Sequence, residues 1–131
     1  MIKVLVADDS AFMRKAISLM IEKDSDIKVI GTARNGEEAL EKIKELKPDV
    51  LTLDIEMPGL NGIEVLKILM KENPLPVLML SSLTKDGAEE TFKALELGAI
   101  DYIAKDLSYV SLDIVKLEKE ILIKMYTIET I

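Results

Sequence analysis

The sequence predicts an α/β fold in which a five-stranded parallel sheet carries helices on both faces. Short runs of aliphatic and β-branched residues alternate five times with stretches of helical periodicity. The runs are apolar almost throughout, as expected of strands that helices cover from both sides. The 131 residues fit one domain with a real core, and no linker or repeat interrupts residues 1 to about 106.

The expected strands are residues 2–7, 27–33, 77–80 and 100–104, together with the run that ends at Asp54. Helical stretches follow them, begun by Ser10, Asn35-Gly36 and Asn61-Gly62, and the fourth is expected to end at Gly98. The apolar faces of these stretches comprise Phe12, Met13, Ala16, Ile17, Met20 and Ile21; Ala39, Leu40, Ile43 and Leu46; Ile63, Leu66, Leu69 and Met70; Ala88, Phe92 and Leu95; and finally Ile114, Leu117, Ile121 and Met125.

The segment from Asp49 to Gly59 joins a buried strand to a turn. Its apolar run ends on the carboxylate of Asp54, and Pro58-Gly59 follows shortly after. An acidic group at the end of a dry strand is costly unless it is paired or functional. Because functional groups of open parallel sheets gather at the carboxyl ends of the strands, the other strand ends bear on the role of Asp54.

Four of the predicted strands end in polar groups, which are Asp8 and Asp9, Asp54, Ser81 and Ser82, and Lys105. Taken singly, an Asp-Asp pair after a strand is usually a turn or a helix cap, and a lone lysine is usually surface charge. Three carboxylates in one crevice would repel each other, and Mg²⁺ would relieve that repulsion while binding phosphate oxygens. A lysine and a hydroxyl in the same crevice would hold an anion. The joint pattern predicts a Mg²⁺ site that handles phosphoryl groups, with a carboxylate as nucleophile.

The composition excludes several other kinds of chemistry. The chain has no cysteine and no histidine, so it forms no disulfide, no Ser-His-Asp triad and no histidine-ligated metal site. A net charge of −7 argues against binding to nucleic acid or to an anionic membrane. No apolar run approaches the roughly 20 residues of a membrane span, and the first residues lack a signal peptide's apolar core. We therefore expect a cytoplasmic protein without membrane insertion.

The strand-end residues, in this order, resemble the receiver domain of two-component response regulators. The resemblance rests on Asp8-Asp9, on Asp54 with Met57-Pro58-Gly59 after it, on Ser81 and on Lys105, and it spans residues 2–105. It implies a flavodoxin-like (βα)5 fold, a doubly wound five-stranded parallel sheet with strand order 2-1-3-4-5. It also implies a receiver core at residues 1–106, with the fifth helix and the start of an interdomain linker at residues 107–131.

Within that family, several segments are most similar to the regulatory domains of chemotaxis protein-glutamate methylesterases. These segments are residues 9–14, 31–36, 81–84, 94–105 and 111–114. The similarity implies a chemotaxis-type histidine kinase as phosphodonor, and a methylesterase catalytic domain or another output protein as partner. A complete methylesterase needs a second, catalytic domain. We therefore expect no esterase activity from this chain, only self-catalysed phosphoryl uptake and aspartyl-phosphate hydrolysis.

The resemblance also implies a phosphoacceptor and a set of metal ligands. Asp54 would take the phosphoryl group from the phosphohistidine of the kinase. Asp8 and Asp9 would hold Mg²⁺ together with Asp54, and the backbone carbonyl of Glu56 would complete the ligand set.

Three further residues would respond to the phosphoryl group. Lys105 would pair with one phosphoryl oxygen and Ser81 would bond another, while Tyr102 stands where the family has its rotating switch aromatic. One departure affects this set, because Asp106 follows Lys105 where the family usually has a cis proline. A cis bond without proline costs about 2.5–4 kcal/mol, so we expect a trans bond and an altered loop there.

Three alternatives remain open at this point. A stand-alone receiver would act by binding a partner. A small flavin-binding electron carrier has the same fold, but Asp8 and Asp9 would repel the flavin phosphate. A Mg²⁺-dependent phosphatase would use Asp54 as nucleophile, yet such enzymes require a second aspartate two residues later, and this chain has Glu56 there.

Overall fold

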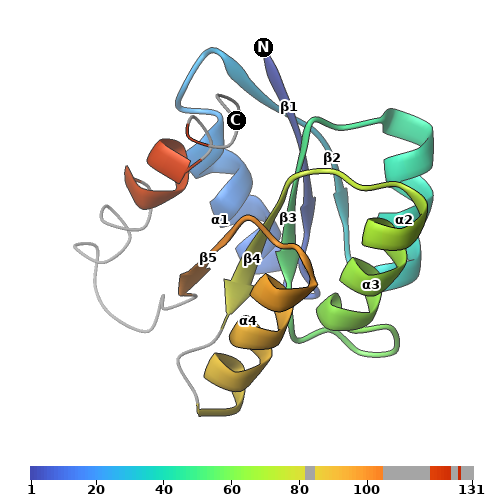
Figure 1. Cartoon of the computed structure of the whole chain (residues 1–131). Coiled ribbons are helices and arrows are strands. Elements are labelled where there is room, and N and C mark those ends of the chain that lie inside the picture. Colours follow the sequence, from blue (N-terminus) through green and yellow to red (C-terminus); the bar gives the residue numbers. More distant parts are fainter. Residues whose placement is uncertain (82–84, 105–118, 125–126, 128–131) are drawn as a thin grey trace.

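In the computed structural model the five strands form one parallel sheet in the order β2-β1-β3-β4-β5, which confirms the predicted fold (Figure 1). The structure describes residues 1–81, 85–104, 119–124 and 127. The strands are β1 (Ile2–Ala7), β2 (Ile27–Ala33), β3 (Val50–Asp54), β4 (Val77–Ser81) and β5 (Asp101–Ala104). The helices between them are α1 (Ala11–Ile21), α2 (Gly36–Leu46), α3 (Gly62–Glu72) and α4 (Lys85–Leu97).

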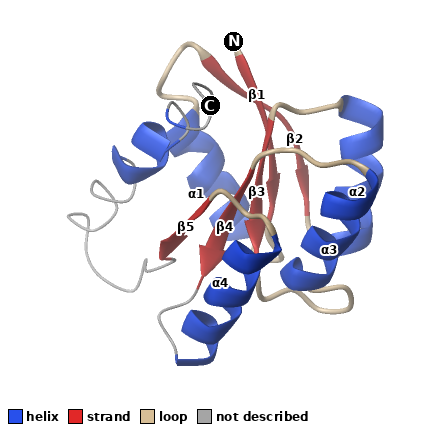
Figure 2. Ribbon diagram, in the orientation of Figure 1, coloured by secondary structure: helices blue, strands red, loops and turns tan. Residues whose placement is uncertain are grey.

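Helices cover the sheet on both faces (Figure 2). α1 and the helical residues 119–124 lie on one face, where Ile17 and Ile121 pack with β-strand residues such as Val6. α2, α3 and α4 lie on the other face, where Leu66 and Ala94 belong to a second core cluster. Among the helices that the structure describes, none has the length and apolar character needed to cross a membrane.

Side-chain caps fix where the helices begin, directly after the strands. Ser10 accepts a hydrogen bond from the backbone N–H of Met13 at the start of α1. Asn61 and Glu64 form a reciprocal capping box at the start of α3. Because each cap satisfies N–H groups that lack a partner within the helix, the loops that follow β1 and β3 are held at defined positions.

The predicted apolar face of the fourth helix is wrong for Ala88 and Phe92, whereas Leu95 packs against the core. Ala88 is exposed, Phe92 is 71% exposed and Leu95 is only partly buried. Among the α4 residues whose burial is described, 87–97, the buried ones are Gly87, Thr91 and Ala94. Leu95 and Leu97 pack against the core beside these small residues, so the inward face of α4 mixes small and large side chains. The apolar periodicity used for the prediction does not detect such a face.

The first helix departs from its predicted face at one residue only. Met13, Ile17 and Met20 are buried as expected, whereas Phe12 is exposed. Phe12 stands in the first turn of α1 beside Met13, and the helix turns Met13 rather than Phe12 toward the core.

The expected fifth helix is described in part. Residues 119–124 are helical, and Ile121 is buried against the α1 face, as the amphipathic pattern predicts. The rest of this prediction lies outside the described residues, namely Ile114, Leu117, Met125 and the domain boundary near residue 106.

Candidate functional site

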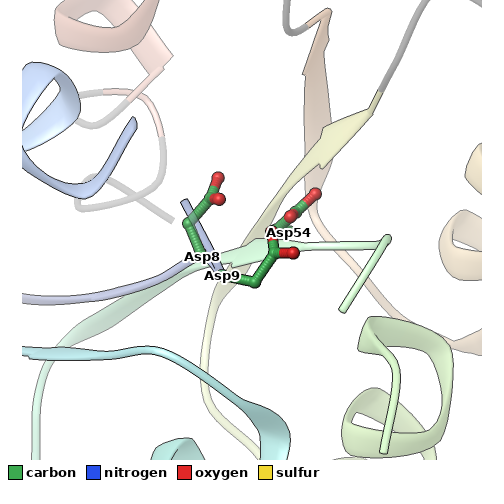
Figure 3. A group of neighbouring side chains, drawn as sticks. All are labelled: Asp8, Asp9 and Asp54. Carbon is green, nitrogen blue, oxygen red and sulfur yellow. The ribbon is translucent and has the colours of Figure 1, made fainter. Parts of the chain in front are cut away.

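Three carboxylates meet at the carboxyl edge of the sheet (Figure 3). β1 and β3 are neighbours, and Ala7 pairs with Leu53. The residues that follow them, Asp8 and Asp54, therefore lie side by side. One side-chain oxygen from each of Asp8, Asp9 and Asp54 lies within 4.8 Å of the other two. Asp8 is 0% and Asp54 1% exposed, whereas Asp9 is exposed. The structure thus brings together the three aspartates that the strand-end pattern singled out.

The chemistry of this donor set fits a hard divalent cation. Carboxylates at this separation repel each other, and burial of Asp8 and Asp54 weakens the screening that water provides. A divalent cation would offset that repulsion. All three donors are carboxylate oxygens, which favour Mg²⁺ or Ca²⁺ over metals that prefer thiolate or imidazole ligands.

Three hydrogen bonds hold the loop that carries the first two aspartates. The backbone N–H of Asp8 donates to the carbonyl of Ala33 on β2 at 3.0 Å, and the N–H of Ser10 donates to Asp8 Oδ1 at 2.9 Å. Arg14 Nη1 donates to the carbonyl oxygen of Asp8 at 2.8 Å. That carbonyl belongs to the peptide group between Asp8 and Asp9, so Arg14 fixes the link between two of the three carboxylates.

The loop after β3 is fixed by close backbone packing. The N–H of Ile55 donates to the carbonyl of Leu80 on β4 at 3.1 Å, and the N–H of Gly62 donates to the carbonyl of Ile55 at 2.9 Å. The N–H of Glu56 donates to Asp54 Oδ1 at 3.3 Å. A Cβ on Gly62 would lie 2.3 Å from the carbonyl oxygen of Asp54. Glycine at this position therefore allows the start of α3 to pack against the end of β3.

Ser81 lies at the same edge of the sheet and bonds to α4. Leu80 pairs with Asp54 across β3 and β4, and Ser81 is the next residue. Its hydroxyl is buried, donates to the carbonyl of Gly87 at 3.1 Å and lies 2.6 Å from Thr91 Oγ1. The sequence indicated no role for Thr91, since a threonine ten residues after a strand end carries no motif.

Tyr102 on β5 is 43% exposed. Lys124 contacts it from the C-terminal helical residues, 5.4 Å from the ring centroid. Lys105, Ser82 and Asp106 lie outside the residues that the structure describes, so the predictions made for them are not tested.

A cleft of about 350 Å³ opens beside the aspartates. Asp9, Glu56 and Glu90 place acidic groups on its wall, and Met57 with Asn61 contribute to its lining. The cleft gives a reactant access to the Asp9 side of the cluster. Glu90 comes from α4, and the strand-end pattern did not include it.

Comparison with known proteins identifies the family of the chain. Residues 4–115 match the family described as "Response regulator receiver domain". Among curated proteins, the chain is 64% identical over 121 residues to "Protein-glutamate methylesterase/protein-glutamine glutaminase 1" of Oleidesulfovibrio alaskensis, covering 92% of this chain and 33% of that protein. It is 51% identical over 124 residues to "Protein-glutamate methylesterase/protein-glutamine glutaminase" of Pyrococcus horikoshii, covering 95% and 34%. The chain thus spans about one third of the length of these relatives.

Solved structures of receiver domains have the same fold as this chain. The response regulator domain of Thermotoga maritima CheB superposes with a TM-score of 0.89 at 50% identity, covering 99% of this chain and 97% of that one. The Francisella response regulator 1452 receiver domain superposes with a TM-score of 0.71 at 36% identity, covering 92% and 98%. By sequence, by fold and by the aspartates at the sheet edge, the chain belongs to the response regulator receiver domain family.

Proposed function

We propose that this chain is a Mg²⁺-dependent phosphoacceptor domain that takes a phosphoryl group on Asp54. The observation that carries the proposal is the convergence of Asp54 with Asp8 and Asp9, with oxygens within 4.8 Å, in a chain of the receiver family. Asp54 is buried at the end of β3, and its cluster borders a cleft open to a reactant.

The metal would be held by Asp8, Asp9 and Asp54, with the main-chain carbonyl of Glu56 as a fourth ligand. When bound, Mg²⁺ supplies positive charge that offsets the carboxylates and attracts phosphoryl oxygens. Arg14 and Ser10 hold Asp8 in place through its main chain and its side chain. These two bonds hold Asp8 in the position from which it would bind the metal.

Phosphoryl transfer would begin with a carboxylate oxygen of Asp54. That oxygen attacks phosphorus of a phosphohistidine, the P–N bond breaks, and the imidazole leaves with a proton. The product is an aspartyl phosphate, which water later hydrolyses to return the carboxylate and inorganic phosphate. The chain contains no histidine, so the donor would be a partner, which we propose is a chemotaxis-type histidine kinase in the cytoplasm.

Lys105 and Ser81 would bond the phosphoryl oxygens that Asp54 gains, and Tyr102 would turn inward as Ser81 moves. The added group carries about −1.5 to −2 charge, so both Lys105 and the Ser81 hydroxyl are attracted to it. The result would be a shift between two arrangements of α4 and β5, limited by the contacts that the phosphoryl group makes in each.

The output we propose is control of a protein-glutamate methylesterase. The named relatives are about three times as long as this chain, and the chain aligns with one third of each. Residues 1–106 would form the receiver core, and residues 107–131 the fifth helix and the start of a linker to the catalytic domain.

Intact mass measures the proposed reaction directly. The chain is incubated with phosphoramidate, with and without Mg²⁺, beside Asp54→Asn and Asp49→Asn. Asp49 is a matched control, since it directly precedes β3 at the end opposite Asp54 and accepts a hydrogen bond from the Lys3 backbone N–H. We expect Mg²⁺-dependent gain of one phosphoryl group in the unmodified chain and in Asp49→Asn, and none in Asp54→Asn. Equal gain by Asp54→Asn would refute the proposal.

The output is tested by joining this chain to the remaining part of the Oleidesulfovibrio alaskensis relative. Methanol release from a methyl-esterified glutamyl protein is then followed with and without phosphoramidate. We expect the phosphodonor to increase the rate, and Asp54→Asn to remove the increase. A rate that does not respond to the phosphodonor would favour a receiver that acts on another partner.

A further inference from the structure

Three oxygen atoms form a buried triangle between β4 and α4. Thr91 Oγ1 lies 2.6 Å from Ser81 Oγ and 2.7 Å from the carbonyl oxygen of Gly87, and Ser81 Oγ lies 3.1 Å from that same carbonyl. Ser81 is 4% and Thr91 7% exposed, so water does not readily replace these contacts. Gly87 and Thr91 belong to the buried face of α4.

The triangle has three contacts but only two hydroxyl protons to fill them. In one arrangement Thr91 donates to Ser81 and Ser81 donates to the Gly87 carbonyl. In the other, Thr91 donates to the Gly87 carbonyl and Ser81 donates to Thr91. If both hydroxyls donated to the carbonyl, two hydroxyl oxygens at 2.6 Å would face each other without a proton between them. Within this triangle, the proton of Ser81 is directed to α4 in both arrangements.

We propose that Thr91 is a positioning residue for Ser81, holding the Ser81 hydroxyl on α4 until a phosphoryl oxygen at Asp54 competes for its proton. This inference rests on the proposed function and adds a residue to it. For Ser81 to donate to a phosphoryl oxygen, its bond within the triangle must break. Thr91 thereby contributes to the free-energy difference between the resting and the phosphorylated arrangement.

The same contacts connect the site to α4. Gly87 stands near the start of α4 and Thr91 one turn later, so Ser81 bonds to the first turns of the helix. When the Ser81 hydroxyl leaves, α4 loses the buried hydrogen bonds that join it to the end of β4. Thr91 keeps its bond to the Gly87 carbonyl, four residues earlier, which preserves the helix itself.

The test is a double-mutant cycle with beryllium fluoride, a tetrahedral phosphoryl analogue that binds carboxylates, in the presence of Mg²⁺. Thr91→Val removes the hydroxyl at nearly constant volume, and calorimetry gives the Kd. Because Thr91→Val removes one of the two contacts that hold Ser81 on α4 and leaves the phosphoryl contact in place, we expect the Kd to fall roughly two- to tenfold. In a Ser81→Ala background the same change should alter the Kd by less than about twofold. Thr91→Ser retains the hydroxyl and should match the unmodified chain.

A Kd unaltered by Thr91→Val, or altered equally with and without the Ser81→Ala substitution, would overturn the inference and leave the proposed function standing. An unmodified chain that neither binds beryllium fluoride nor gains a phosphoryl group would overturn the proposed function, and this inference with it. A crystal structure of the unmodified chain with Mg²⁺ and beryllium fluoride gives a check without any substitution. Ser81 Oγ should lie beyond about 3.5 Å from Thr91 Oγ1, and a retained contact would contradict the inference.

Discussion

Lys124 Nζ lies 2.7 Å from the main-chain carbonyl oxygen of Tyr102 and 5.4 Å from the centroid of its ring. The same ammonium group pairs with Asp101 Oδ1 and with Glu120 Oε1, each at 3.3 Å. Lys124 thus joins the C-terminal helical residues to β5 beside the proposed switch aromatic. The contact with the ring favours the partly exposed position of Tyr102.

Lys124→Met should loosen this attachment. The substitution keeps much of the apolar stem but removes the charge, so the bond to the Tyr102 carbonyl and the ring contact are both lost. We expect the free energy of unfolding to fall by about 1 kcal/mol and the Tyr102 ring resonances to shift in NMR spectra. Lys67→Met on the exposed side of α3 is the control. Ring resonances identical to those of the unmodified chain would show that Lys124 does not position Tyr102.

Arg14 should contribute more to stability than the other arginine of the chain. Its bond to the Asp8 carbonyl is charge-assisted and partly buried, so Arg14→Ala should lower the free energy of unfolding by about 1.5–3 kcal/mol. Arg34 pairs with Glu38 through a side chain that is 73% exposed, and Arg34→Ala should cost less than about 0.5 kcal/mol. Urea unfolding measures both. Equal losses would mean that the contact with Asp8 is not the source of the effect.

Gly62→Ala should destabilise the chain although alanine is the better helix former. The new Cβ would lie 2.3 Å from the carbonyl oxygen of Asp54 and 2.7 Å from Ile55 Cα, and neither backbone atom moves easily. We expect a net loss of at least ~1 kcal/mol in unfolding free energy, despite the ~1 kcal/mol that alanine gains in an ordinary helix. Since the strain falls on the peptide of Asp54, phosphoryl uptake should also slow. Lys67→Ala, on the same helix, should leave both quantities nearly unaltered.

Asp9→Asn should separate metal binding from folding. The change removes one of three like charges, so the metal-free chain should be at least as stable as the unmodified one. The exposed Asp9 carboxylate is partly screened, and we expect Mg²⁺ affinity to fall about tenfold, equivalent to ~1.4 kcal/mol. The Tm as a function of Mg²⁺ concentration reports both effects. Asp26→Asn, an exposed aspartate before β2, controls for net charge, and an equal loss of Mg²⁺ response there would count against the site.

The fold could be predicted because each strand and helix has its own local signal. The alternation of apolar runs and helical stretches predicts the parallel sheet. Ser10, Asn35 and Asn61 cap the helices that they were expected to begin. Such signals depend on near neighbours in the sequence. The prediction of the buried face of α4 failed because Phe92, the largest apolar residue there, is exposed, while smaller residues are buried.

The candidate site could be predicted at its three aspartates and at Ser81, which lies at the same edge of the sheet. Asp8, Asp9 and Asp54 follow strand ends, and parallel strands bring such residues to one edge. Arg14 and Thr91 act through single hydrogen bonds to Asp8 and Ser81, and a bond between separate elements leaves no periodic pattern in the sequence. These residues could be recognised only after the elements were placed in space.

Chemical trapping identifies the carboxylate that carries the phosphoryl group, which we propose is that of Asp54. The chain is treated with phosphoramidate and Mg²⁺, then with borohydride, which reduces an acyl phosphate to an alcohol and so converts the modified aspartate to homoserine. Proteolysis and tandem mass spectrometry locate the conversion. We predict homoserine at position 54 alone, and only when both phosphoramidate and Mg²⁺ were present before the borohydride. Homoserine at position 8 or 9 instead of 54 would mean that Asp54 is not the phosphoacceptor.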